Sequence, residues 1–170
     1  MRTFFLAICL FCFQLAMAES LPKGIIEAKV RPAPTLVLSD MDGKTSDLSK
    51  SRGRWTFVHF WASWCGPCRK EMPSIQKLIT TMQDSNIDFY IINTAENEDT
   101  IFEFLAATSP DLNTLLDRDG LATEAWQPRG LPATYLVDPA GIVRYQALGG
   151  REWNSTPYKD FITRLITSTK

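Results

Sequence analysis

The chain has 170 residues and a formal net charge of −1, and 45% of its residues are hydrophobic. This length and composition suit one globular domain with a substantial core. Acidic and basic residues are balanced, with no long run of either sign. The charge distribution therefore gives no reason to expect binding to nucleic acid or to an anionic membrane surface.

The first eighteen residues have the pattern of a secretory signal peptide. A single positive charge is followed by an apolar run over residues 4–17, which is shorter than the about 20 residues that span a bilayer. The triplet ending at Ala18 matches the small-x-small pattern of a cleavage site, so we predict export and removal of this segment. An uncleaved N-terminal membrane anchor is the alternative. Cys9 and Cys12 lie inside the segment and carry no chemistry if it is removed.

The region before the main sheet predicts an extended start followed by a hairpin. Residues 19–34 are interrupted by prolines and lack clear periodicity, which predicts an extended lead-in to a domain over residues 35–170. A turn signal at 42–44 lies between apolar residues and predicts a short strand-turn or hairpin. Residues 55–61 then form a nearly unbroken apolar run, which is typical of a strand buried on both faces.

Helices and strands alternate over the rest of the chain. A long helix is predicted to open at the cysteine motif, because apolar residues recur there at three- and four-residue spacing. Ile101, Phe102 and Leu105 are predicted to form the buried side of the next helix. Further strands are expected at 87–92, 114–116, 132–137 and 142–147, and further helices at 99–107, 121–126 and 157–166. This order predicts an α/β fold with a mixed central sheet flanked by helices and an N-terminal strand or hairpin extension.

Cys65 and Cys68 lie where the buried strand ends and the long helix begins. Thiol–disulfide exchange requires a thiolate, which the N–H groups and dipole of a helix N-terminus stabilise. We predict that Cys65 attacks a client disulfide and that Cys68, on the same side of the first turn, resolves the mixed disulfide. Pro67 suits the start of a helix through its fixed φ. A structural zinc site would need four ligands, and outside the signal segment only His59 adds a sulfur or imidazole donor, so no metal is expected.

Several blocks of sequence resemble the thioredoxin superfamily, and together they are similar to the exported TlpA/ResA-like thiol:disulfide oxidoreductases. Residues 64–68 match the thioredoxin active-site sequence, and residues 130–134 resemble the segment that carries the cis-proline of that superfamily. The wider similarity extends from about residue 36 to the C-terminus and includes residues 60–64, 69–73 and 136–141.

The resemblance implies a thioredoxin fold and disulfide exchange that needs no cofactor. It also implies that Pro132 is cis and faces the cysteines, where its loop presents backbone groups to an incoming client strand. Client contacts are then expected at four residues around the cysteines and the proline: Trp64, Gly66, Pro67 and Leu131.

Glu71 lies one helical turn beyond Cys68, and in the resembling family a carboxylate at this position is partly buried and assists the proton transfers of the resolving cysteine. We hypothesise that Glu71 has a raised pKa and acts as acid or base for Cys68, with a solvated helix glutamate as the alternative. His59, in the middle of the buried strand, is expected to be a hydrogen-bonded structural residue. Trp61 is expected to pack in the core. The sequence does not indicate a role for residues 149–153.

The resemblance and the Gly-Pro pair between the cysteines favour a reductant of disulfides in exported proteins, located in the periplasm or an equivalent compartment. Family members of this sort keep apocytochrome c cysteines reduced for haem attachment, so the resemblance implies such clients. A reductant in an oxidising compartment must be re-reduced, which implies a membrane electron donor. A disulfide-forming oxidant and a Cu(I)-binding chaperone remain open as alternatives. We expect a monomer.

Overall fold

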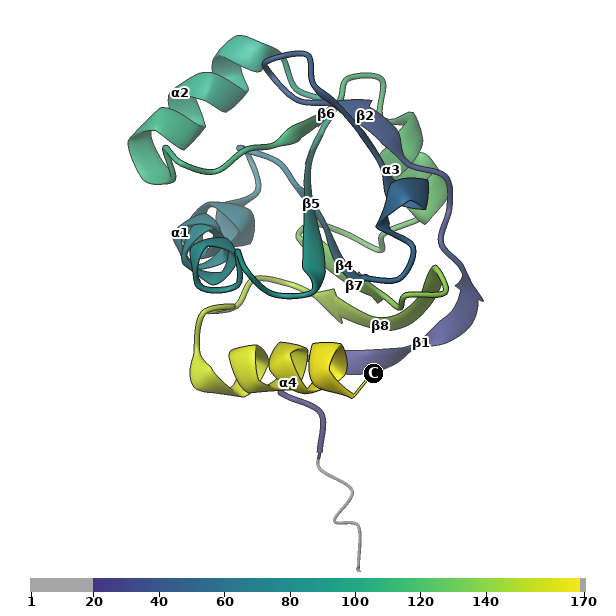
Figure 1. The fold of residues 1–170 in the computed structure, drawn as a ribbon. Helices are drawn as coiled ribbons and strands as arrows, with labels where there is room; N and C mark the ends of the chain where they lie inside the picture. The colour runs from purple at the N-terminus through teal and green to yellow at the C-terminus, as the bar shows by residue number, and fades with distance from the viewer. Residues whose placement is uncertain (1–19, 169–170) are drawn as a thin grey trace, which may run out of the picture.

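The computed structural model describes residues 20–168, so the predicted signal peptide lies outside the described residues. Six strands form one sheet: β1 (Ile25–Pro32), β4 (Trp55–Trp61), β5 (Ile87–Thr94), β6 (Leu115–Asp117), β7 (Ala133–Val137) and β8 (Ile142–Leu148). Their order is β1-β8-β7-β4-β5-β6 (Figure 1). The β4, β5 and β6 strands are parallel neighbours, whereas β7 is antiparallel to β4 and to β8. The predicted mixed sheet is confirmed.

Helices cover both faces of this sheet. They are α1 (Gly66–Thr81), α2 (Glu98–Thr108), α3 (Leu121–Trp126) and α4 (Thr156–Thr167). A two-stranded hairpin of β2 (Val37–Ser39) and β3 (Thr45–Asp47) precedes a short 3-10 helix (Leu48–Ser51), as expected of the N-terminal extension. Figure 1 shows α1 and α3 on opposite sides of the sheet. Among residues 20–168, no helix is both long and apolar enough to cross a membrane.

The central strand β4 is buried along its whole length, as its apolar run predicts. Side chains alternate between the two faces of a strand. Phe57 and Trp61 belong to the core that contains residues of α1, α2 and α4, whereas Val58 and Phe60 belong to the core that contains Trp126 of α3. Helix α1, with the cysteines at its start, therefore packs against a strand that is buried on both faces.

The lead-in predicted over residues 19–34 is extended, but much of it is part of the main sheet. Residues 25–32 form β1, which pairs antiparallel with β8 through partners such as Ile25 and Ala147. Most β1 side chains are exposed or half-buried, so the strand has no strong apolar alternation in sequence. Pro32 is tolerated because β1 is an edge strand, where a missing N–H breaks no ladder.

The prediction that Phe102 lies on the buried side of α2 is wrong. Phe102 is 62% exposed, whereas Phe104 is 7% exposed and its ring centroid lies 5.3 Å from that of Trp61. Successive helix residues are rotated by about 100°, so the buried face of α2 runs through Ile101, Phe104 and Leu105.

These two phenylalanines on one helix make a matched pair for a stability measurement. We expect Phe104→Ala to lower the free energy of unfolding by about 3 kcal/mol or more, because it removes a buried ring beside Trp61. Phe102→Ala should change it by no more than about 0.5 kcal/mol, because the ring is exposed. Urea denaturation of both variants checks this, and equal losses would contradict the assigned helix face.

Candidate active site

Cys65 and Cys68 form a disulfide at the N-terminus of α1. Cys65 is the N-cap residue, and its sulfur accepts a hydrogen bond from the backbone N–H of Cys68 at 3.2 Å. Cys65 is 5% exposed, while Cys68 is completely buried. The structure thus gives a client access only to the first sulfur, and it places the second beneath it.

A partly buried polar cluster holds the turn that leads from β4 into the cysteine motif. The Ser63 N–H donates to Glu96 Oε2 at 2.7 Å, and the Ser63 hydroxyl donates to the other carboxylate oxygen of Glu96. Asn93 Nδ2 also donates to Glu96 Oε2, at 2.7 Å. Glu96 follows β5 in the chain, and its role was not predicted because no sequence motif connects it with Ser63. The cluster fixes the backbone two residues before Cys65.

The Leu131–Pro132 peptide bond is cis, as the resemblance implies. Ala133, the next residue, pairs with Phe60 near the end of β4. This register brings Pro132 to the end of the sheet at which β4 stops and the chain continues into the cysteine motif. Leu131 is half-buried in the same loop, and Trp64 on the motif side is 70% exposed. The two segments expected to contact a client therefore lie at the same end of the central strands, where the apolar side chain of Trp64 is exposed to solvent.

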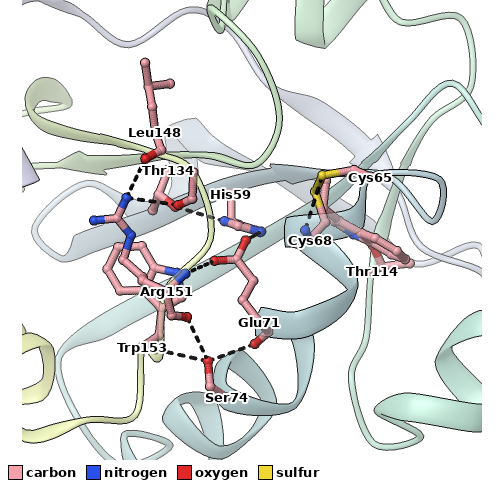
Figure 2. A network of polar contacts seen from close by, with 12 residues as sticks. His59, Cys65, Cys68, Glu71, Ser74, Thr114, Thr134, Leu148, Arg151 and Trp153 are labelled. Atoms are coloured by element: carbon pink, nitrogen blue, oxygen red, sulfur yellow. Dashed lines mark hydrogen bonds and ion pairs between the residues drawn. A yellow bond between two sulfur atoms is a disulfide. The ribbon is translucent and has the colours of Figure 1, made fainter. Parts of the chain in front are cut away.

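Glu71 is buried beneath the cysteine motif, so the alternative of a solvated helix glutamate is wrong. Its Oε2 accepts a hydrogen bond from the Arg151 backbone N–H at 3.0 Å (Figure 2). Burial raises the pKa of Glu71 to about 8, against the opposing effects of the Arg151 N–H and positive charge. A carboxyl with such a pKa can both give and accept a proton near neutral pH.

His59 points from β4 toward the same carboxyl group. Its Nε2 lies 3.3 Å from Glu71 Oε1, and its Nδ1 lies 2.9 Å from Thr134 Oγ1 on β7. Burial, aided by the positive charge of Arg151, lowers the pKa of His59 to about 3, so the imidazole is neutral at physiological pH. The hydrogen-bonded histidine expected from the sequence is present, but its position beside Glu71 was not predicted.

The spacing of α1 contained a signal for this contact. Glu71 lies three residues after Cys68 and four before Ile75, so it falls on the buried face of the helix. Similarly, His59 shares a face of β4 with Phe57 and Trp61, which pack in the core on the α1 side. The two periodicities place the imidazole and the carboxyl group in the same layer between β4 and α1, but they do not specify that the two groups meet.

Residues 149–153 form a loop that binds the first turns of α1. The N–H of Gly149 donates to the Pro132 carbonyl at 3.0 Å, and Gly150 lies so close to Pro67 that an added Cβ would be 2.8 Å from its carbonyl oxygen. The Trp153 N–H donates to Ser74 Oγ at 3.0 Å. The loop thus joins the cis-proline, the redox motif and the buried carboxyl, a role that sequence alone did not indicate.

An open pocket of about 490 Å³ lies between this loop and the start of α1. The residues around it come from the redox motif, from α1 and from the loop: Gly66, Pro67, Lys70, Glu71, Gly150, Arg151 and Glu152. Glu71 therefore borders a pocket that opens to solvent beside the cysteine motif, while its carboxyl group is itself buried.

Comparison with known proteins agrees with this geometry. Residues 30–146 match the model of the AhpC/TSA family. The chain belongs to the AhpC/TSA family. This family member is 31% identical to the thiol-disulfide oxidoreductase ResA of Bacillus subtilis over 111 residues, which are 65% of the chain and 62% of that protein. It is 30% identical to ResA of Geobacillus kaustophilus over 138 residues, 81% of the chain and 76% of the relative. The chain spans 62% and 64% of the first two ResA relatives, the second from Geobacillus thermodenitrificans.

Solved structures of thiol:disulfide proteins confirm the thioredoxin fold of this AhpC/TSA family member. A Chlorobium tepidum protein assigned as the thiol:disulfide interchange protein DsbE superposes with a TM-score of 0.68 at 26% identity, covering 88% of this chain and 99% of the other. The thioredoxin domain of a thiol-disulfide oxidoreductase from Bacteroides vulgatus gives a TM-score of 0.68 at 24% identity, covering 86% and 99%.

The raised pKa of Glu71 predicts a pH dependence of stability. The folded state holds a proton that the unfolded state releases above its pKa of 4.5, so the stabilisation is complete below pH 4.5 and is lost as pH rises toward about 8. We expect the free energy of unfolding of the oxidised protein to fall over this range, and Glu71→Gln to reduce that slope. Urea denaturation at a series of pH values checks this. The exposed neighbour Glu152, changed to Gln, should keep the slope, and a slope unaffected by Glu71→Gln would contradict the assignment.

The close approach of Gly150 to Pro67 predicts a steric requirement for glycine. We expect Gly150→Ala to lower the free energy of unfolding by about 1–3 kcal/mol, because the added methyl group meets a backbone carbonyl that cannot move independently. Gly130→Ala is the control, since nothing lies within 4 Å of its added Cβ, and it should be neutral or stabilising by up to about 1 kcal/mol. Equal effects in urea denaturation would rule out a tight contact between the loop and the motif.

Proposed function

We propose that this protein is a thiol:disulfide oxidoreductase that reduces disulfide bonds in exported client proteins. The observation that carries the proposal is the disulfide at the N-terminus of α1, at the same end of the central strands as the cis Leu131–Pro132 bond. The similarity to ResA oxidoreductases supports the same chemistry. No cofactor is needed, because both electrons come from the two thiols.

The reaction begins at Cys65. Its thiolate attacks one sulfur of the client disulfide, the client S–S bond breaks, and a mixed disulfide forms between Cys65 and the client. The released client thiolate takes up a proton. The N–H groups at the start of α1, including that of Cys68, stabilise the attacking thiolate when the pair is reduced. Exposed Trp64, together with Gly66 and Pro67, provides the surface that the client strand meets.

Cys68 completes the reaction from its buried position. Its thiol loses a proton to the carboxylate of Glu71, one helical turn away, and the resulting thiolate attacks the sulfur of Cys65. The mixed disulfide breaks, the second client thiolate leaves, and the Cys65–Cys68 disulfide forms. Two electrons have then passed from the protein to the client. Glu71 suits this step because a carboxyl with a pKa of about 8 accepts a thiol proton more readily than an exposed one.

We further propose that the clients include precursors of c-type cytochromes and that a membrane thiol donor returns the protein to its dithiol form. The resemblance to TlpA/ResA-like proteins supports both points, as does the signal-peptide pattern of residues 1–18 for an exported location. A reductant in an oxidising compartment cannot act more than once without such a donor. A monomer suffices, since every reacting group comes from one chain.

The equilibrium reduction potential of the Cys65–Cys68 pair tests the direction of electron flow. We expect a value at or below about −230 mV, measured in redox buffers on the chain from residue 19 onward by trapping of free thiols. A value near −120 mV would instead identify a disulfide-forming oxidant.

Cysteine variants in the same assay identify the attacking residue. With an oxidised C-x-x-C-H peptide as client, Cys65→Ser should lose all reduction, and Cys68→Ser should accumulate the mixed disulfide. The opposite pattern would exchange the two roles.

A further inference from the structure

We propose that His59 and Glu71 hold one exchangeable proton between them, so that the imidazole changes tautomer whenever the carboxyl group gains or loses a proton. His59 is then a positioning residue for the proton that Glu71 takes from Cys68. This last step rests on the proposed function, whereas the sharing of the proton does not.

Two buried polar atoms, one on each side chain, face each other. His59 Nε2 and Glu71 Oε1 are 3.3 Å apart, both side chains are essentially inaccessible to solvent, and neither atom has a hydrogen-bond partner among the described residues (Figure 2). Buried polar atoms without partners are disfavoured. A proton on either atom lets it donate to the other and removes both deficits.

The remaining polar atoms of the pair are already engaged. Glu71 Oε2 accepts from the Arg151 N–H, which leaves Oε1 as the oxygen that meets the imidazole. His59 Nδ1 lies 2.9 Å from Thr134 Oγ1, and a hydroxyl can either accept or donate. The imidazole is therefore held at both ring nitrogens by groups that tolerate either tautomer.

Two complete hydrogen-bond arrangements follow. When Glu71 is protonated, its hydroxyl donates to bare Nε2, and Nδ1 carries the ring proton and donates to Thr134. When the pair has lost one proton, Nε2–H donates to the carboxylate, and bare Nδ1 accepts from the Thr134 hydroxyl. In neither arrangement does the imidazole or the carboxyl group have a donor or acceptor without a partner, so Glu71 can change its protonation while both side chains stay fully hydrogen-bonded.

The charged groups around the pair favour a neutral imidazole in both arrangements. On the loop after β8, the positive charge of Arg151 opposes a charged His59, while Glu152 opposes a charged Glu71. On α1, Lys70 lines the neighbouring pocket. Complete burial also disfavours the imidazolium. The low-pH form of the pair is accordingly neutral acid with neutral imidazole, not an ion pair.

The chain contains one histidine, so the tautomer can be measured without assignment by mutation. The full chain is labelled with 15N-histidine and kept oxidised, so that neither cysteine of the motif titrates. We expect the Nδ1–H tautomer at low pH and the Nε2–H tautomer at high pH, with a midpoint near pH 8 and no imidazolium at neutral pH. The 13C resonance of the Glu71 carboxyl should titrate with the same midpoint.

Two variants separate this proposal from a merely structural histidine. Glu71→Gln should abolish the tautomer change, whereas Glu152→Gln, which alters a carboxylate beside the same pocket, should retain it. A single tautomer across about pH 6–10 would overturn the proposal, as would a change that persists in Glu71→Gln or different midpoints for the two wild-type resonances. The last comparison needs no variant to fold. Because no client is present, loss of reductase activity would not affect the result, and a fixed tautomer would leave the proposed function standing.

Discussion

The buried carboxyl group of Glu71 is the constraint around which the active-site end of this protein is arranged. Removing a carboxyl group from water is unfavourable unless its oxygens find partners. One oxygen is served by the N–H of Arg151, which requires the loop over residues 149–153 to lie against α1. The other faces His59, which requires an imidazole in the middle of β4. The side chain of Glu71 thus contacts both the loop and the central strand and fixes their positions relative to α1.

The same loop connects this buried pair with the surface that meets a client. Its first glycine binds the carbonyl of Pro132, and the next packs on Pro67 between the two cysteines. Behind the motif, Glu96 holds Ser63 and so fixes the turn that delivers Cys65. The redox pair is therefore held by three separate parts of the chain, namely the loop over residues 149–153, the segment at Pro132, and Glu96 after β5. Such preorganisation suits a reaction in which sulfur atoms must meet along a defined line.

Neutral polar groups suit this interior better than an ion pair would. The environment that favours protonated Glu71 also favours an uncharged His59, since burial opposes both charges. A carboxyl group that is protonated near neutral pH has a proton to give or a place to receive one, which a permanently ionised group lacks. Membership of the AhpC/TSA family and similarity to ResA place the chain among thioredoxin-fold proteins. The pairing of the Glu71 carboxyl group with His59 is read from the contacts of this chain instead.

Local periodicity and turn residues specify the order of strands and helices from about residue 36 onward, the burial of β4, and the position of the cysteines at a helix start. The family motif added the cis-proline. That residues 25–32 complete the sheet is evident only from their pairing with β8, since their mostly exposed side chains carry no pattern. The burial of Phe104 rather than Phe102, by contrast, follows from its helical spacing to Ile101 and Leu105. Only the folded chain brings Glu71, His59 and Arg151 together, because periodicity places a side chain on one face of its own element and does not specify which distant residue it meets.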